Sequence, residues 1–206
     1  QLLQPGDTTE RFTYHVELTP CAVGPGTEDG YMVTKRVPSL ENMIWRLRVK
    51  FPQVDVDDLE KRAQKLVNHV FPTFLTREAA MLGILQKNLA PEYRHKVPRP
   101  LGIEKDSRGF VRTLHMNWMR VGGATLSQLE FAEQSAELLA ALHEQARVMH
   151  LDLRMDNMVI TPDGKAVAFR PSSVGRAPAP PELNARTSAR LAYAGGVASV
   201  RGRKDT

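Results

Sequence analysis

The sequence predicts an α+β protein in which an antiparallel sheet is combined with several helices. Three observations support this prediction. Short stretches near the start of the chain alternate between apolar and polar residues, which is the period of a strand. A longer region with apolar residues three and four positions apart follows, as in helices that bury one face. Further strand-like stretches and a long amphipathic segment occupy the second half of the 206-residue chain.

The first pair of strands is predicted over residues 12–23 and 31–37. Between them, residues 24–30 have the glycine-rich composition of a turn. A period of two places every second side chain on the same face of a sheet. The pair is therefore expected to form a β-hairpin. In its first strand the apolar members of the period are Phe12, Tyr14, Val16 and Leu18.

Residues 39–70 are expected to form two helices. The second should begin near Asp57 or Asp58, because acidic side chains are favoured at the positive end of a helix. Pro72 is expected to end it, since proline has no N–H to donate within a helix. Thr76 can then cap a third helix.

The second half of the chain predicts a further hairpin, a helix and a last hairpin. The helix has a long amphipathic pattern, and Ser127 is a suitable N-cap for it. The last hairpin turns at a Pro-Asp-Gly sequence, which is typical of tight turns. The predicted strands cover residues 97–103 and 110–119, the helix covers 127–146, and the last hairpin covers 158–169.

The charge distribution disfavours nucleic-acid binding. The net charge is +5, but residues 1–169 carry 21 acidic and 21 basic side chains, so the excess lies in residues 170–206. This last stretch is rich in Ala, Arg, Pro, Gly and Ser, and we expect a basic, disordered tail. Only Tyr193 in it could stack on a base, so nucleic acid is an unlikely partner.

Cysteine content and hydropathy exclude other classes. The single cysteine, Cys21, excludes an internal disulfide and a multi-cysteine zinc site. No apolar run approaches the roughly 20 residues that span a membrane, and no signal peptide is recognisable. We therefore expect no membrane partner and a cytoplasmic location.

Trp45 and Trp118 are expected to be packing residues.

The densest group of reactive side chains lies at residues 150–157, His-Leu-Asp-Leu-Arg-Met-Asp-Asn. Asp152 can orient the proton of an acceptor hydroxyl, and the Asn157 amide oxygen can bind a metal ion that bridges phosphates. Arg154 can offset the charge of a transferred phosphoryl group. The alternative is a polar loop in which the Asp and Asn side chains merely cap turns.

This segment resembles the catalytic loop of the protein-kinase-like superfamily, His-x-Asp-Leu-Lys/Arg-x-x-Asn. The likeness extends over roughly residues 12–169. It implies ATP and Mg²⁺ as cofactors, Asp152 and Arg154 as catalytic residues, and Asn157 as a metal ligand. It also implies a two-lobed protein-kinase-like fold, with a small antiparallel-sheet lobe and an incomplete helical lobe.

The resemblance also assigns a nucleotide-binding role to two charged residues. Lys35 stands where the family has the strand lysine that holds the ATP phosphates, and Glu78 stands where a helix supplies its ion-pair partner. Each has an alternative interpretation. Lys35 could be a solvated strand lysine, and Glu78 an exposed acid favoured by the helix dipole.

The stretch that includes residues 114–119 resembles the strand and hinge between the two lobes. Met116 would then border the adenine pocket, and the backbone of Asn117, Trp118 and Met119 would bond the adenine edge. The predicted domains are a small lobe over residues 1–121 with a helical insertion at 39–71, the start of a large lobe over 122–169, and the tail over 170–206.

Three features depart from the family pattern. The turn at residues 24–30 lies too near Lys35 to be the glycine-rich phosphate loop, which we expect in or before residues 1–12, around Gly6. The metal-binding Asp-Phe-Gly is replaced by Ala168-Phe169-Arg170. The chain also ends before a large lobe could be completed. A C-terminal truncation, or a frameshift near residue 168, would explain the last two.

Two functions remain open. The first is an ATP-dependent phosphotransferase, protein Ser/Thr kinase-like, of weak or no activity, whose acceptor is a protein or small-molecule hydroxyl. Arg154 beside the catalytic Asp favours the protein acceptor. The second is a non-catalytic pseudokinase that binds nucleotide or acts as a scaffold, which the missing metal-binding Asp favours.

Overall fold

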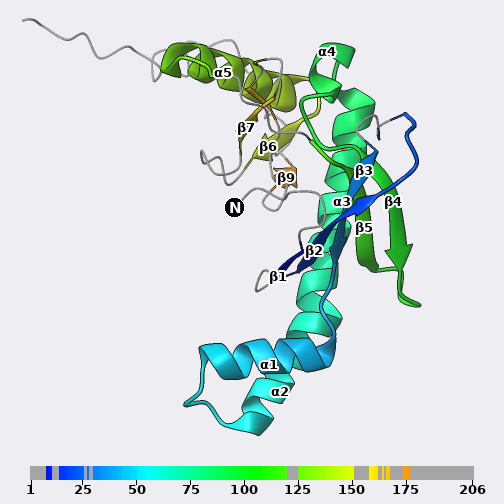
Figure 1. Cartoon of the computed structure of the whole chain (residues 1–206), viewed down its shortest axis with the longest axis vertical. Coiled ribbons are helices and arrows are strands. Elements are labelled where there is room, and N and C mark those ends of the chain that lie inside the picture. The colour runs from blue at the N-terminus through cyan, green and yellow to red at the C-terminus, as the bar shows by residue number, and fades with distance from the viewer. Residues whose placement is uncertain are drawn as a thin grey trace, which may run out of the picture.

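The computed structural model describes residues 8–10, 14–25, 27, 30–119, 125–150, 158–161, 164, 166–167 and 174–176. Its main feature is a five-stranded antiparallel sheet with the strand order β1-β2-β3-β5-β4 (Figure 1). Helices pack on this sheet, so the predicted α+β class is confirmed for these residues. The strands are β1 (Thr8–Glu10), β2 (His15–Pro20), β3 (Tyr31–Arg36), β4 (Pro100–Lys105) and β5 (Val111–Asn117).

The first predicted hairpin is formed by β2 and β3. Val16 lies opposite Lys35, and Leu18 lies opposite Val33. The turn between the strands closes where the Cys21 N–H donates to the Gly30 carbonyl at 2.9 Å. Gly30 has a φ of 70°, a conformation that glycine adopts at little cost. The glycine-rich stretch is therefore the turn before β3, as the sequence indicated.

The second hairpin, β4 and β5, adds its strands on the other side of β3. β5 pairs directly with β3, and Leu114 lies opposite Lys35. The turn joining β4 to β5 is closed by a hydrogen bond from the Gly109 N–H to the Asp106 carbonyl, 2.9 Å. Lys35 therefore lies in the central strand, with a paired strand on each side.

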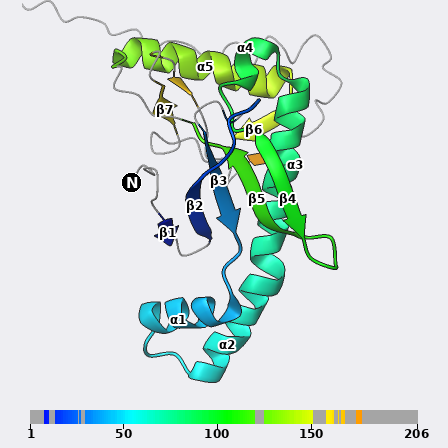
Figure 2. The ribbon, with the colours of Figure 1, turned by 45° about the vertical axis from the view of Figure 1, so that its right-hand side comes forward.

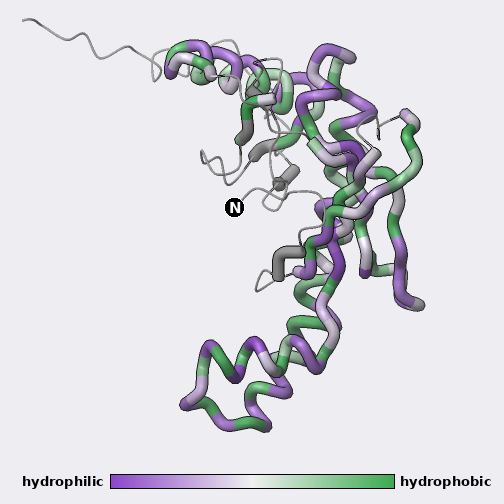
Figure 3. The backbone as a smooth tube through the Cα atoms, in the orientation of Figure 1, coloured by the Kyte–Doolittle hydropathy of each residue, from purple (hydrophilic) through white to green (hydrophobic). Residues whose placement is uncertain are grey.

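Two helices precede the sheet-covering helix. α1 (Leu40–Lys50) begins after Ser39, whose hydroxyl accepts a hydrogen bond from the Asn42 N–H. α2 (Val56–Lys65) begins after Asp55, so Asp57 and Asp58, near which its start was predicted, both lie in its first turn. Figure 3 shows apolar and polar residues interleaved along both helices, as expected for helices that each bury one face.

The structure corrects the expectation that Pro72 ends a helix. α2 continues through a π-helical segment, η1 (Leu66–Val70), directly into α3 (Phe71–Asn88). Pro72 is the second residue of α3 and lies within the continuous run, where it has no N–H to donate to the preceding turn. Thr76 is not a cap but an interior residue of α3, and its hydroxyl donates to the Pro72 carbonyl at 2.7 Å. The predicted boundary of the insertion at residue 71 thus falls within a continuous helical run.

Figures 1 and 2 show α3 running along the sheet from the α1–α2 hairpin at one end to α5 at the other. α4 (Pro91–Arg94) is a single turn. α5 (Gln128–Glu144) has the predicted Ser127 cap, and Ser127 and Glu130 form a reciprocal capping box. The predicted helix at 127–146 is therefore confirmed.

Short strands follow α5. β6 (Val148–His150) pairs with β9 (Val174–Arg176), and β7 (Val159–Ile160) pairs with β8 (Ala166–Val167). The β7–β8 pair is the last predicted hairpin. β9 departs from the expectation that residues 170–206 lack structure, because a sheet edge can pair with any extended backbone regardless of composition.

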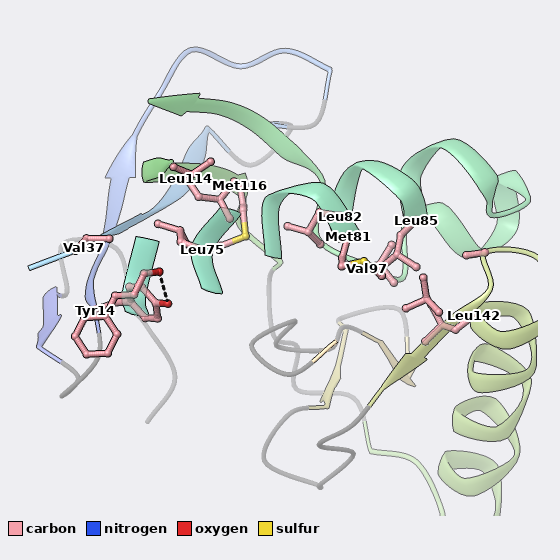
Figure 4. Close-up of a cluster of buried hydrophobic side chains, with 14 of the residues drawn as sticks. Tyr14, Val37, Leu75, Met81, Leu82, Leu85, Val97, Leu114, Met116 and Leu142 are labelled. Carbon is pink, nitrogen blue, oxygen red and sulfur yellow. Dashed lines mark hydrogen bonds between the residues drawn. The ribbon is translucent and has the colours of Figure 1, made fainter. Parts of the chain in front are cut away.

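A continuous apolar core joins the sheet, α3 and α5. Figure 4 shows it extending from Tyr14 and Leu114 on the sheet side, past Leu75 and Leu82 of α3, to Leu142 of α5. Leu75, Leu82 and Leu114 are fully buried. The core therefore fixes α3 between the sheet and the following helix.

The two tryptophans differ in environment. Trp118 packs edge-on against Tyr31, with ring centroids 5.6 Å apart. Trp45 is 60% exposed on α1, so its predicted packing role is wrong. Its neighbours Met43 and Leu47 take the buried face of that helix instead.

Among the described helices, none has the length and apolar content needed to cross a membrane.

Candidate nucleotide-binding site

A buried ion pair between the sheet and α3 is the centre of the candidate site. The Lys35 ammonium of β3 donates to the Glu78 carboxylate of α3, with Nζ and Oε2 2.5 Å apart. Lys35 is 9% exposed and Glu78 is 5% exposed. The ion pair that the sequence resemblance implied is therefore present, and the two alternatives of a solvated lysine and an exposed acid do not hold.

Glu78 lies within the apolar stripe of α3. The stripe is formed by residues four and three positions apart, and Glu78 takes the place between Leu75 and Leu82 that a hydrophobic residue would normally occupy. Burying a carboxylate among such neighbours is costly unless a cation and hydrogen bonds compensate it. Lys35 provides both, so the pair holds α3 against the sheet at this point.

Tyr14 completes the cluster, and sequence reasoning missed it as a site residue. The Lys35 Nζ lies 4.4 Å from the centre of the Tyr14 ring, within cation–π distance. The Tyr14 hydroxyl donates to the Phe71 carbonyl of α3 at 3.2 Å, drawn as the dashed line in Figure 4. Tyr14 therefore contacts both elements that carry the ion pair: β3, which carries Lys35, and α3, which carries Glu78.

The electrostatics of Tyr14 follow from this position. Burial raises the pKa of the Tyr14 phenol above its ordinary value, and the nearby Glu78 charge raises it further. Tyr14 therefore stays neutral and serves as a hydrogen-bond donor and an aromatic face. No signal within its own strand identifies Tyr14, because its contact with Lys35 follows from the register in which Val16, two residues later on the same face, pairs with Lys35.

The predicted hinge residues lie at the end of β5. Met116 is buried and lies opposite Val33 of β3. The Asn117 N–H donates to the Arg99 carbonyl at 3.0 Å, and its side-chain oxygen accepts from the Arg99 N–H at 2.6 Å. The Asn117 N–H is thus already engaged within the protein. The adenine contact of Asn117, Trp118 and Met119 stays a prediction.

The predicted catalytic loop lies outside the described residues. Asp152, Arg154 and Asn157 belong to residues 151–157, between β6 and β7. How they lie relative to Lys35 is therefore also outside what the structure describes. Gly6 and Ala168 to Arg170 also lie outside. Within the part of the chain that the structure describes, no group of three or more His, Cys, Asp or Glu residues could hold a metal ion.

The comparisons with known proteins found likenesses to solved structures. No family model matches the sequence, and no curated protein matches it. The complex of Rv3197 with erythromycin from Mycobacterium tuberculosis resembles this chain with a TM-score of 0.44 and 16% sequence identity. The match covers 73% of this chain and 42% of Rv3197, so this chain spans less than half the length of that protein.

Proposed function

We propose that this chain carries the nucleotide-binding part of a kinase-like phosphotransferase that uses ATP. The observation that supports this most is the buried Lys35–Glu78 pair in the central strand and the sheet-covering helix. An ammonium has three donors, and Glu78 takes one of them. The remaining donors can bind phosphate oxygens, while Glu78 and the Tyr14 ring keep the ammonium in one position.

The chemistry of these residues fits an ATP phosphate chain. Lys35 is a point charge on a strand, which suits phosphate binding without requiring a planar, bidentate ligand. Met116 offers an apolar surface at the end of the neighbouring strand, as an adenine ring needs. In this proposal, Trp118 and Met119 supply the backbone contacts to the adenine edge.

The remaining roles belong to the loop at residues 151–157. Asp152 orients the acceptor hydroxyl and takes up its proton, and Arg154 balances charge on the transferred phosphoryl group. Asn157 would hold Mg²⁺, which would supply positive charge to the phosphates. Arg154 next to Asp152 favours a protein Ser/Thr hydroxyl as the acceptor over a small molecule.

A second function is favoured by one specific feature. At the position expected for the metal-binding Asp, the sequence has Ala168-Phe169-Arg170. Without that carboxylate the protein would hold nucleotide through Lys35 but transfer phosphate slowly or not at all. A pseudokinase that binds nucleotide, or acts as a scaffold, is therefore the alternative.

Calorimetric titration with ATP, with and without Mg²⁺, tests nucleotide binding. We expect Lys35→Met to weaken binding by about tenfold or more, which corresponds to one lost charge-assisted contact. Lys61→Met, on the exposed face of α2, is the matched control and should bind as the wild type does. Equal binding by Lys35→Met and Lys61→Met would remove the proposal.

Autophosphorylation then separates the enzyme from the pseudokinase. Transfer of labelled phosphate to the chain, or to a Ser/Thr peptide, that is lost in Asp152→Asn supports the enzyme. ATP binding without any transfer, and unchanged by Asp152→Asn, supports the pseudokinase.

A further inference from the structure

The junction between η1 and α3 contains carbonyl groups that the helix itself does not satisfy. The Phe71 N–H donates to the Leu66 carbonyl, the five-residue spacing of a π-helix. The next residue, Pro72, has no N–H, so it cannot serve the carbonyl of Val67 or that of Asn68. Val67 is buried, and a buried carbonyl without a donor is costly, so its donor must come from elsewhere. Asn68 is exposed, so its carbonyl can bond either water or a side chain.

Two arginines of the β4–β5 hairpin provide these donors. Arg112 donates to the Val67 carbonyl and Arg108 donates to the Asn68 carbonyl, both at 2.7 Å. Asp106 holds the Arg108 guanidinium in place at 2.9 Å. Desolvation by itself would raise the pKa of Asp106, but hydrogen bonds from Arg108 and Phe110 outweigh it and lower the pKa.

A third contact joins the same hairpin to the next turn of α3. The Val111 N–H donates to the Thr76 hydroxyl at 2.8 Å. The three contacts, which we call the hairpin clamp, are Arg108 to Asn68, Val111 to Thr76 and Arg112 to Val67. They fix α3 along its own axis relative to β5.

From this geometry we propose that the hairpin clamp positions Glu78 against Lys35. On α3, Glu78 follows Thr76 by two residues. On β5, Leu114 follows Arg112 by two residues, and Leu114 lies opposite Lys35 of β3. The two ends of the ion pair are therefore set by the same helix and the same strand that the clamp joins. Arg108 and Arg112 are positioning residues, a role that rests on the proposed function, in which Glu78 orients Lys35 toward phosphate.

Small movements of the helix would be enough to break the pair. Each residue of an α-helix rises 1.5 Å and turns about 100° around the axis. A slip of α3 by a single residue would carry the Glu78 carboxylate off the face that meets β3. Loss of the clamp should therefore free Lys35 locally, while the apolar core leaves the rest of the fold in place.

Selective chemical labelling of lysines tests this in the whole chain without nucleotide. Acetic anhydride modifies amines that are accessible, and mass spectrometry reports each lysine separately. Lys35 and Lys96 are each 9% exposed, so both should react slowly in the wild type. Lys96 follows α4, away from the clamp, and reports any general loosening of the fold.

We expect Arg112→Met, and more strongly Arg108→Ala with Arg112→Met, to raise the labelling rate of Lys35 by about tenfold relative to Lys96. Arg112→Lys keeps a donor and should restore part of the protection. The matched control is Arg77→Met, an exposed arginine on α3 beside Glu78, which should leave the ratio unchanged.

Two outcomes would overturn the proposal. If the Lys35 rate stays at the wild-type value in the clamp variants, the arginines only satisfy carbonyls. If Lys35 and Lys96 rise together, the arginines stabilise the fold in general. ATP titration of the same proteins tests the proposed function separately, because a wild type that fails to bind ATP removes that function and leaves the labelling result standing.

Discussion

The Lys35 ammonium lies 4.4 Å from the centre of the Tyr14 ring, while the Tyr14 hydroxyl is bonded to the Phe71 carbonyl of α3. A single side chain thus contacts the lysine on one side and the helix that carries its partner on the other. The ring face and the hydroxyl make different contacts. One substitution can remove the hydroxyl alone, and a second can remove both groups.

Tyr14→Phe should lower the free energy of unfolding by about 1 kcal/mol, because it removes the hydroxyl contact to Phe71 and keeps the ring face. Tyr14→Leu should cost about 1 kcal/mol more, since it also removes the cation–π contact and aromatic surface. Urea unfolding followed by circular dichroism measures both. Equal costs for the two variants would mean that the ring face does not stabilise Lys35.

Stability should also depend on Tyr14 at alkaline pH. Burial and the Glu78 charge raise the pKa of Tyr14 in the folded protein, whereas the unfolded chain has a tyrosine pKa of about 10. Above about pH 10 the unfolded state loses this proton and the folded state keeps it, so stability falls by up to about 1.4 kcal/mol per pH unit.

Tyr14→Phe has no phenol to ionise and should lose less stability than the wild type between about pH 8 and about pH 11. Urea midpoints of the two proteins at both pH values measure the difference. A variant with the same alkaline loss as the wild type would contradict a buried, neutral Tyr14.

The ion pair makes a prediction about paired substitutions. Glu78→Leu leaves the Lys35 ammonium buried without its carboxylate and should cost about 3–5 kcal/mol. Adding Lys35→Met removes the stranded charge, and the stripe of α3 becomes fully apolar, so most of that stability should return. A double-mutant cycle by urea unfolding gives the coupling energy. Additive losses would show that the two charges are solvated independently.

Thr76 tests the clamp at the first residue of β5, Val111. Thr76→Val keeps the shape of the side chain and removes the acceptor of the Val111 N–H, which should cost about 1–3 kcal/mol because a buried donor loses its partner. Thr76→Ser retains the hydroxyl and is the matched control. Hydrogen exchange of the Val111 amide, followed by NMR, should quicken in Thr76→Val alone.

Much of the fold follows from local sequence patterns. The hairpins around residues 24–30 and 105–109 and the helix capped by Ser127 could be predicted, because their turns and caps depend on residues close in sequence. Pro72 could not be assigned correctly in this way. In the continuous helical run that contains it, Arg108 and Arg112 donate to two carbonyls before the proline, and the sequence context of these arginines resembles that of ordinary surface charges.

Of the candidate site, the Lys35–Glu78 pair could be predicted from the sequence, and Tyr14 could not. The family resemblance indicated Lys35 and Glu78, and the apolar spacing around Glu78 gives independent support, because a lone acid in such a stripe needs a buried partner. The sequence pattern predicts Tyr14 only as an apolar strand residue, because its contact with Lys35 depends on the register between β2 and β3. Strand register is set by tertiary packing and is not readable from one strand alone.

Covalent labelling by an acyl-phosphate derivative of ATP tests most directly whether Lys35 meets nucleotide phosphates. Such a reagent transfers its acyl group to a lysine lying beside the bound phosphates, and peptide mass spectrometry identifies that lysine. If Lys35 has the proposed role, its peptide is labelled ahead of those of Lys61 and Lys96, and excess ATP suppresses the label. Labelling of Lys35 that is no faster than that of Lys61, or that ATP does not suppress, would contradict the role.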